Sequence, residues 1–337
     1  MLEEIQKIND AKRNMALDYM KAILTINMIF AHTIQLLSFF WDSSAPKLIS
    51  RSLGFLSLFV NITTFSSFLF CFGYVFYVAY FKNFKNSKQK LFRNGINTLI
   101  AYYISAFGIY IIDNEVIGFG NIYNILVLNN IIGYSEFLLA FSFISFLTIF
   151  IGDYILKITS NYRILLIYSV ILIVSSSFIP YSIIPPQLGI FIGSSKFASF
   201  PILLYFPYFL LGVYISKNNI VFNKYILIGT AALSSSSILY ITIWGMPSRF
   251  PPSIFWLTLS FLYTYCLYLL CSQIGKINFG VFFKRIGQNS LLYLLISNLI
   301  LRYFMHHNPF NVGWWGIFIV TGIIFIVANQ IITIVRK

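Results

Sequence analysis

Charged residues are scarce in this chain of 337 residues: Asp, Glu, Lys and Arg together make up 9% of it, and nine of them are acidic. A soluble domain carries about 25% charged residues, which excludes a water-soluble globular protein. Cysteine is also rare. Cys71, Cys266 and Cys271 each fall in an apolar stretch. Three such residues supply neither a disulfide framework nor a zinc pattern, so we expect buried thiols.

Apolar sequence fills the chain instead. Hydrophobic residues make up 58% of it, and the mean hydropathy is +0.81. Apolar stretches of about 20 residues, the length of a membrane-spanning helix, recur from end to end. The alternating ten-residue segments of a transmembrane barrel are not found. The expected fold class is therefore all-α: a polytopic membrane protein that forms a single domain over residues 1–337, with no separate soluble domain. The expected spans are residues 16–38, 53–81, 94–113, 134–152, 163–180, 198–216, 224–245, 252–273, 286–305 and 313–334.

The net charge of +14 follows this pattern of spans. With the N-terminus in the cytoplasm, 17 Lys and Arg residues fall on the cytoplasmic side and five on the outer side. This positive-inside asymmetry predicts ten helices with both termini in the cytoplasm. The basic charge is thus a signal of topology, and we do not expect nucleic acid as a partner. The expected location is a cell membrane, plasma or inner, in a bacterium.

The first span, between Arg13 and Phe40, carries Asp18, Lys21 and His32. Lys21 and His32 are 11 residues apart, which places both on one helix face and about 16 Å apart along the axis. An ionisable group inside a span is costly and marks a functional site by default. We interpret His32 as a general base and Asp18 as a candidate partner. Two alternatives stay open: a histidine that is hydrogen-bonded for packing, and an interfacial Asp18–Lys21 ion pair.

Five further residues are candidates near span ends. Lys90 and Arg93 open the third span, where two cations at a helix N-terminus suit a phosphate, although they also fit the positive-inside bias. Glu136 opens the fourth span on the outer side, either to orient His32 or as a surface residue. Arg302 and His306 at the outer end of the ninth span could contact an acceptor or snorkel to the interface. No metal and no bound cofactor are expected.

The pattern Arg13, Leu17–Asp18, Lys21 and His32 resembles the first helix of the membrane acyltransferase superfamily. The similarity is greatest to the acyltransferase-3 family. Pilus-acetylating proteins and heparan-glucosaminide acetyltransferase-like proteins are related branches that share the pattern. This chain has Ala22 where a glycine is usual.

Two later segments extend the resemblance. Residues 90–103 are similar to the family's Arg-x-x-Arg entry to its third helix, with Lys90 in place of the first Arg. Residues 285–298 resemble its penultimate helix, but Ile296 and Ser297 stand where that helix often carries a histidine.

The resemblance implies transfer of an acyl group, usually acetyl from acetyl-CoA, to a hydroxyl or amine of a sugar or other cell-envelope acceptor. Acyl-CoA is then a co-substrate, and Lys21, Lys90, Arg93 and Arg13 are its expected binding residues. Membrane lipid, the envelope acceptor and a second copy of the chain are the other expected partners. The alternative function is a transporter or flippase for a lipid-linked saccharide or other anionic substrate, which would use the same charges.

Overall fold

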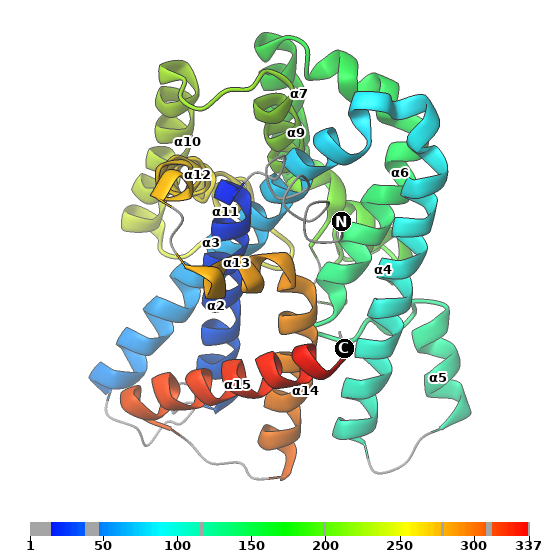
Figure 1. The fold of residues 1–337 in the computed structure, drawn as a ribbon, viewed down its shortest axis with the longest axis vertical. Helices are drawn as coiled ribbons and strands as arrows, with labels where there is room; N and C mark the ends of the chain where they lie inside the picture. The colour runs from blue at the N-terminus through cyan, green and yellow to red at the C-terminus, as the bar shows by residue number, and fades with distance from the viewer. Residues whose placement is uncertain are drawn as a thin grey trace, which may run out of the picture.

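The computed structural model describes residues 15–37, 47–114, 118–197, 200–277, 280–307 and 312–335 (Figure 1). Helix makes up 83% of these described residues, and no strand occurs among them. The helices are α2 (Met15–Leu37), α3 (Lys47–Ala79), η2 (Phe81–Asn83), α4 (Phe84–Asp113), α5 (Phe119–Leu126), α6 (Glu136–Ile158), α7 (Tyr162–Ser175), η3 (Ser176–Phe178), α8 (Pro186–Ile192), α9 (Ile202–Lys217), α10 (Lys224–Trp244), α11 (Ile254–Leu259), α12 (Phe261–Ile277), α13 (Val281–Gln288), α14 (Ser290–His307) and α15 (Trp314–Val335).

Within these ranges, six helical segments are long and apolar enough to cross a membrane. They are Met15–Leu37, Gly54–Asp113, Glu136–Ile158, Lys224–Trp244, Ile254–Gly275 and Trp314–Ile334. The second contains both α3 and α4, and α7 and α9 are shorter apolar helices. The all-α polytopic class is therefore confirmed. Each expected span coincides with a helix or with two consecutive helices, while the ten-span count and the cytoplasmic termini stay predictions.

The last helix differs from the others in its direction. Figure 1 shows α15 lying across α2 and α14, both of which it contacts, instead of running alongside them. Its sequence is nevertheless the most apolar of the six candidate segments.

Large apolar side chains cover the outer faces of several helices. Ile167 on α7 is 55% exposed, Ile238 on α10 is 52% exposed and Ile319 on α15 is 61% exposed. Soluble proteins seldom expose extensive apolar patches. These faces therefore suit contact with lipid chains. The expectation of buried thiols is confirmed at Cys71 and Cys271 but is wrong at Cys266, which is exposed.

Close approaches between helices enclose α2, the helix that carries His32. A side chain at Gly287 on α13 would overlap the backbone carbonyl oxygen of Asp18. Gly73 on α3 and Gly212 on α9 likewise allow those two backbones to meet, as small residues do in membrane helix pairs. With α3, α12, α13 and α14 around it, α2 buries 15 of its 23 residues. Asp18 and His32 are thus buried, while Lys21 is partly exposed.

The segment expected to lead into the third span is already helical. Helix α4 begins at Phe84, so Lys90 and Arg93 lie in its second and third turns, and both are exposed. Only the first four N–H groups of a helix lack intrahelical partners. The predicted phosphate corner at a helix N-terminus is therefore wrong at this position. Any contact between these two residues and an anion would rest on side-chain charge alone.

Candidate active site

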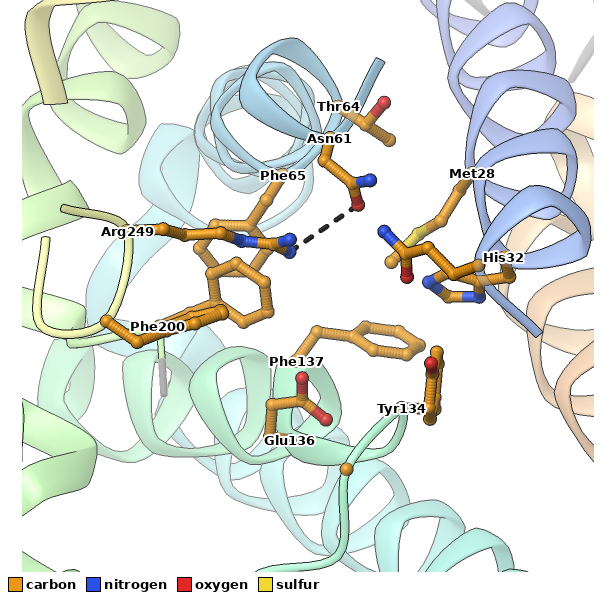
Figure 2. A pocket seen from close by; sticks show the side chains of 13 residues that line it. Met28, His32, Asn61, Thr64, Phe65, Tyr134, Glu136, Phe137, Phe200 and Arg249 are labelled. Atoms are coloured by element: carbon orange, nitrogen blue, oxygen red, sulfur yellow. Dashed lines mark hydrogen bonds between the residues drawn. The ribbon is translucent and has the colours of Figure 1, made fainter. Parts of the chain in front are cut away.

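A cavity of about 180 Å³ lies between α2, α3, α6 and the segment that precedes α11 (Figure 2). His32, Glu136 and Arg249 line it, from three separate parts of the chain. Aromatic rings, those of Phe65, Tyr134, Phe137, Phe200 and Phe250, form much of the remaining wall. Electrostatic interactions are stronger in such surroundings than in water, because the local dielectric constant is low.

His32 is buried and is held by Asn298 of α14. The imidazole Nδ1 lies 2.7 Å from the Asn298 side-chain oxygen Oδ1. The amide orientation is fixed because Asn298 Nδ2 donates to the backbone carbonyl of Tyr134 at 2.9 Å. An amide oxygen can only accept, so Nδ1 carries the proton and donates it. The other ring nitrogen, Nε2, then has a free lone pair, as a general base requires.

Tyr134 completes this arrangement from the segment before α6. Its backbone lies in the left-handed region, with φ of 67°, which non-glycine residues seldom adopt. The edge of its ring meets the His32 ring at 4.8 Å between centroids, and the Arg302 guanidinium lies 5.6 Å from its centroid. Together with the Asn298 hydrogen bond, these contacts hold a strained residue against the imidazole.

Glu136 is the first residue of α6, where a carboxylate is favoured by the helix dipole. Its Oε2 atom is buried and has no hydrogen-bond partner. In Figure 2 the carboxylate points into the cavity, across from Arg249. Of the two alternatives for Glu136, its place in the same cavity as His32 favours a role near the imidazole, but it is Asn298 that bonds Nδ1.

Arg249 was not among the residues selected from the sequence. It lies between α10 and α11 and reaches into the cavity, where Nη2 donates to Asn61 Oδ1 at 3.4 Å. Burial lowers the pKa of the guanidinium, and the neighbouring Tyr205 and Glu136 oppose that shift. Arginine nevertheless stays protonated in proteins. A loop arginine gives no periodic signal, so only the fold brings it opposite His32.

The comparisons with known proteins identify the family. A family model described as "Heparan-alpha-glucosaminide N-acetyltransferase, catalytic" matches residues 13–245. The chain belongs to this family.

Neither a curated protein nor a solved structure matches the chain. The matched segment of this acetyltransferase-family protein includes His32, Asn61 and Glu136, whereas Arg249 and Asn298 lie beyond it. The resemblance to membrane acyltransferases is thus confirmed at the level of an acetyltransferase-like membrane family. The family shown is the heparan-glucosaminide branch, not acyltransferase-3.

The residues predicted to bind acyl-CoA in this acetyltransferase-family protein lie apart from the cavity. Lys21 forms an ion pair with Asp18 at 3.2 Å, with Asp18 buried and Lys21 partly exposed. Asp18 precedes His32 by 14 residues, or about 21 Å along the helix, and so cannot bond the imidazole. Lys90 and Arg93 lie on a different helix, α4. Arg13 lies outside the described residues.

Arg302 and His306, the predicted acceptor-side residues, do not line the cavity that contains His32. Arg302 forms an ion pair with Asp113 at the end of α4, and this pair ties α14 to α4. His306 is exposed and meets the ring of His307 at 5.0 Å. Arg302 contacts the cavity wall at the ring of Tyr134. No group of three or more His, Cys, Asp or Glu residues in the described ranges is placed to hold a metal ion.

Proposed function

We propose that this protein transfers an acetyl group from cytoplasmic acetyl-CoA to a hydroxyl or amine of a sugar or other cell-envelope acceptor. The observation that carries the proposal is the hydrogen bond between His32 Nδ1 and Asn298 Oδ1. Asn298 accepts from Nδ1–H of the imidazole, which lines the cavity, so Nε2 keeps its lone pair. The family's name favours the amine of a glucosaminide as the acceptor group.

The reaction needs one base and one positioned thioester. His32 Nε2 takes the proton from the acceptor O–H or N–H while the oxygen or nitrogen forms a bond to the acetyl carbonyl carbon. The carbon–sulfur bond breaks, and the electron pair leaves with the CoA sulfur. The proton on Nε2 then passes to that thiolate, which returns the imidazole to its starting state. An acetyl-imidazole intermediate is a second route through the same nitrogen.

The two substrates would approach from opposite ends of α2. Lys21 lies about 16 Å below His32 on the helix axis, a distance comparable to an extended pantetheine arm. Cations at the Lys21 end suit the phosphates of CoA. The cavity at the His32 end would receive the acceptor, so that binding alone brings the two reacting groups together.

Release of CoA by the purified protein tests this function. We expect thioester cleavage that depends on acceptor, with glucosamine glycosides and neutral hexosides as the first probes. The turnover rate of the His32→Ala variant should be at least about 100-fold lower than that of the wild type, because a general base accelerates such a reaction by about 10²–10⁴-fold. His307→Ala, which changes an exposed histidine outside the cavity, is the matched control and should keep full activity.

Two results would contradict the proposal. A His32→Gln protein that turns over as fast as the wild type would make the histidine a packing residue. Movement of a saccharide across proteoliposomes that depends on His32 but releases no CoA would make the protein a transporter.

A further inference from the structure

Among the described residues, Arg249 differs from Lys21 and Arg302 in lacking a carboxylate partner within ion-pair distance. Lys21 is paired with Asp18 and Arg302 with Asp113. No carboxylate oxygen of the described residues lies within 4.0 Å of the Arg249 guanidinium. Its Nε atom is buried, and a charge removed from water is costly unless an opposite charge contacts it. The cavity therefore holds a positive charge that is open to an anion.

The guanidinium is fixed in place by aromatic rings. It lies 4.6 Å from the ring centroid of Phe250, 5.8 Å from that of Trp256 and 5.9 Å from that of Phe200. These cation–π contacts hold the group but use none of its N–H donors. Its position is therefore set before any ligand arrives.

Most hydrogen-bonding capacity of this guanidinium is unused. A guanidinium has five N–H donors. One bonds Asn61 Oδ1 at 3.4 Å, and the Nε atom is buried without a partner. In Figure 2 the group points into the cavity from the side opposite His32. This planar, immobilised fork matches the oxygen atoms of a carboxylate, sulfate or phosphate.

Glu136 limits where an anion can lie. Its carboxylate faces the same cavity but does not come within 4.0 Å of the guanidinium. It repels a negative group on the α6 side and accepts hydrogen bonds from a hydroxyl or an ammonium. The two charges thus suit an occupant with an anionic group at one end and donor groups at the other.

We propose that Arg249 forms a subsite for an anionic group of the acceptor, so that the acceptor is a saccharide or similar molecule bearing a carboxylate, sulfate or phosphate. The group that is acetylated would then face His32. This inference rests on the proposed acetyltransferase function for the reaction, although the binding itself can be measured without it. Arg249 lies beyond the segment that the family model matches, so the family membership does not supply this subsite.

Equilibrium binding to the whole protein in nanodiscs, without acetyl-CoA, tests the subsite. The probes share a hexose ring: methyl glucuronide, glucose 6-sulfate, glucose 6-phosphate and the neutral methyl glucoside. We expect at least one anionic probe to bind about tenfold more tightly than methyl glucoside or better, the effect of one buried hydrogen bond to a charged group. The probe that binds most tightly identifies which anionic group Arg249 prefers. Added salt should reduce the difference in affinity between that probe and methyl glucoside.

Variants show whether this preference belongs to Arg249. Arg249→Gln should bind all four probes equally, while Arg249→Lys keeps the charge without the planar fork and should retain part of the preference. Lys196→Gln removes an exposed cation that does not line the cavity and should retain all of it. If Arg249→Gln does not fold, the affinities of the wild type for the anionic and neutral probes still test whether the cavity has an anion subsite.

The possible results separate this inference from the proposed function. Equal binding of all four probes by the wild type would overturn the subsite and indicate that Glu136 neutralises Arg249. A preference for anions that survives in Arg249→Gln would also overturn it. An anion preference that depends on Arg249, in a protein that releases no CoA, would support the subsite and contradict only the acetyltransferase proposal.

Discussion

Asn298 and His32, 266 residues apart in the chain, lie 2.7 Å apart between the amide oxygen and the imidazole Nδ1. The bond crosses from α14 to α2, and the Asn298 amide nitrogen donates to the backbone carbonyl of Tyr134, in the segment before α6. One side chain therefore joins three segments. Any movement of α14 relative to α2 would change the orientation and the tautomer of the imidazole.

Replacing Asn298 should slow turnover without weakening substrate binding. Asn298→Leu fills the space but accepts no hydrogen bond, so Nδ1–H loses its partner and the ring can adopt the unproductive tautomer. We expect kcat to fall about 10- to 100-fold, from the loss of about 1.5–3 kcal/mol. Both KM values should stay near those of the wild type, measured by steady-state CoA release.

The conservative variant Asn298→Asp is the control for this positioning role, since a carboxylate still accepts from Nδ1–H. It should retain more activity than Asn298→Leu. Equal losses in the two variants, or a large rise in the acceptor KM, would show that Asn298 contributes to packing or to acceptor binding instead.

The Asp18–Lys21 pair should contribute to stability separately from any role in CoA binding. In Lys21→Gln the buried Asp18 carboxylate loses its cation, and we expect about 1–3 kcal/mol of destabilisation, measured as a lower Tm in detergent. The double variant Asp18→Asn/Lys21→Gln removes both charges and should recover most of the Tm.

The KM for acetyl-CoA in that double variant then reports on Lys21 alone. A raised KM at restored Tm would support Lys21 as a residue that binds CoA. A KM equal to that of the wild type would leave the ion pair as a purely structural feature.

Neutralising Lys90 and Arg93 together should raise the KM for acetyl-CoA about 5- to 30-fold, because two exposed charge contacts of about 0.5–1 kcal/mol each would be lost. The acceptor KM should change little. Arg163→Gln/Lys224→Gln removes the same two kinds of cation, also exposed and on the expected cytoplasmic side. If both double variants raise the KM equally, the effect comes from general surface charge and not from a CoA site.

The predicted orientation can be tested by labelling in sealed cells. Cys266 is exposed, so the background is Cys266→Ser. Ser195→Cys, at an exposed position in the predicted outer loop, should react with an impermeant maleimide from outside. Gln89→Cys, at an exposed position near the basic start of α4, should react only after lysis. Labelling of Gln89→Cys in intact cells would contradict the positive-inside model.

The sequence by itself determined the class of the protein and its central residue. Twenty-residue apolar stretches must form helices in a membrane, because the backbone has to satisfy its own hydrogen bonds there. This requirement is local, which is why each expected span coincides with a helix or with two consecutive helices. An ionisable residue such as His32 can also be recognised from the sequence, because the apolar stretch around it is local. The acetyltransferase resemblance also rests on such local spacing within α2.

Tertiary structure alone decided what surrounds His32. Asn298 and Arg249 are a helix asparagine and a loop arginine, and neither position shows any periodic pattern in the sequence. They become parts of the cavity because α14 packs against α2 and because the segment before α11 turns back over α3. Helix packing depends on shape, such as the close approach at Gly287. Local sequence spacing fixes which face of a helix a residue occupies, but it does not fix which distant helix that face meets.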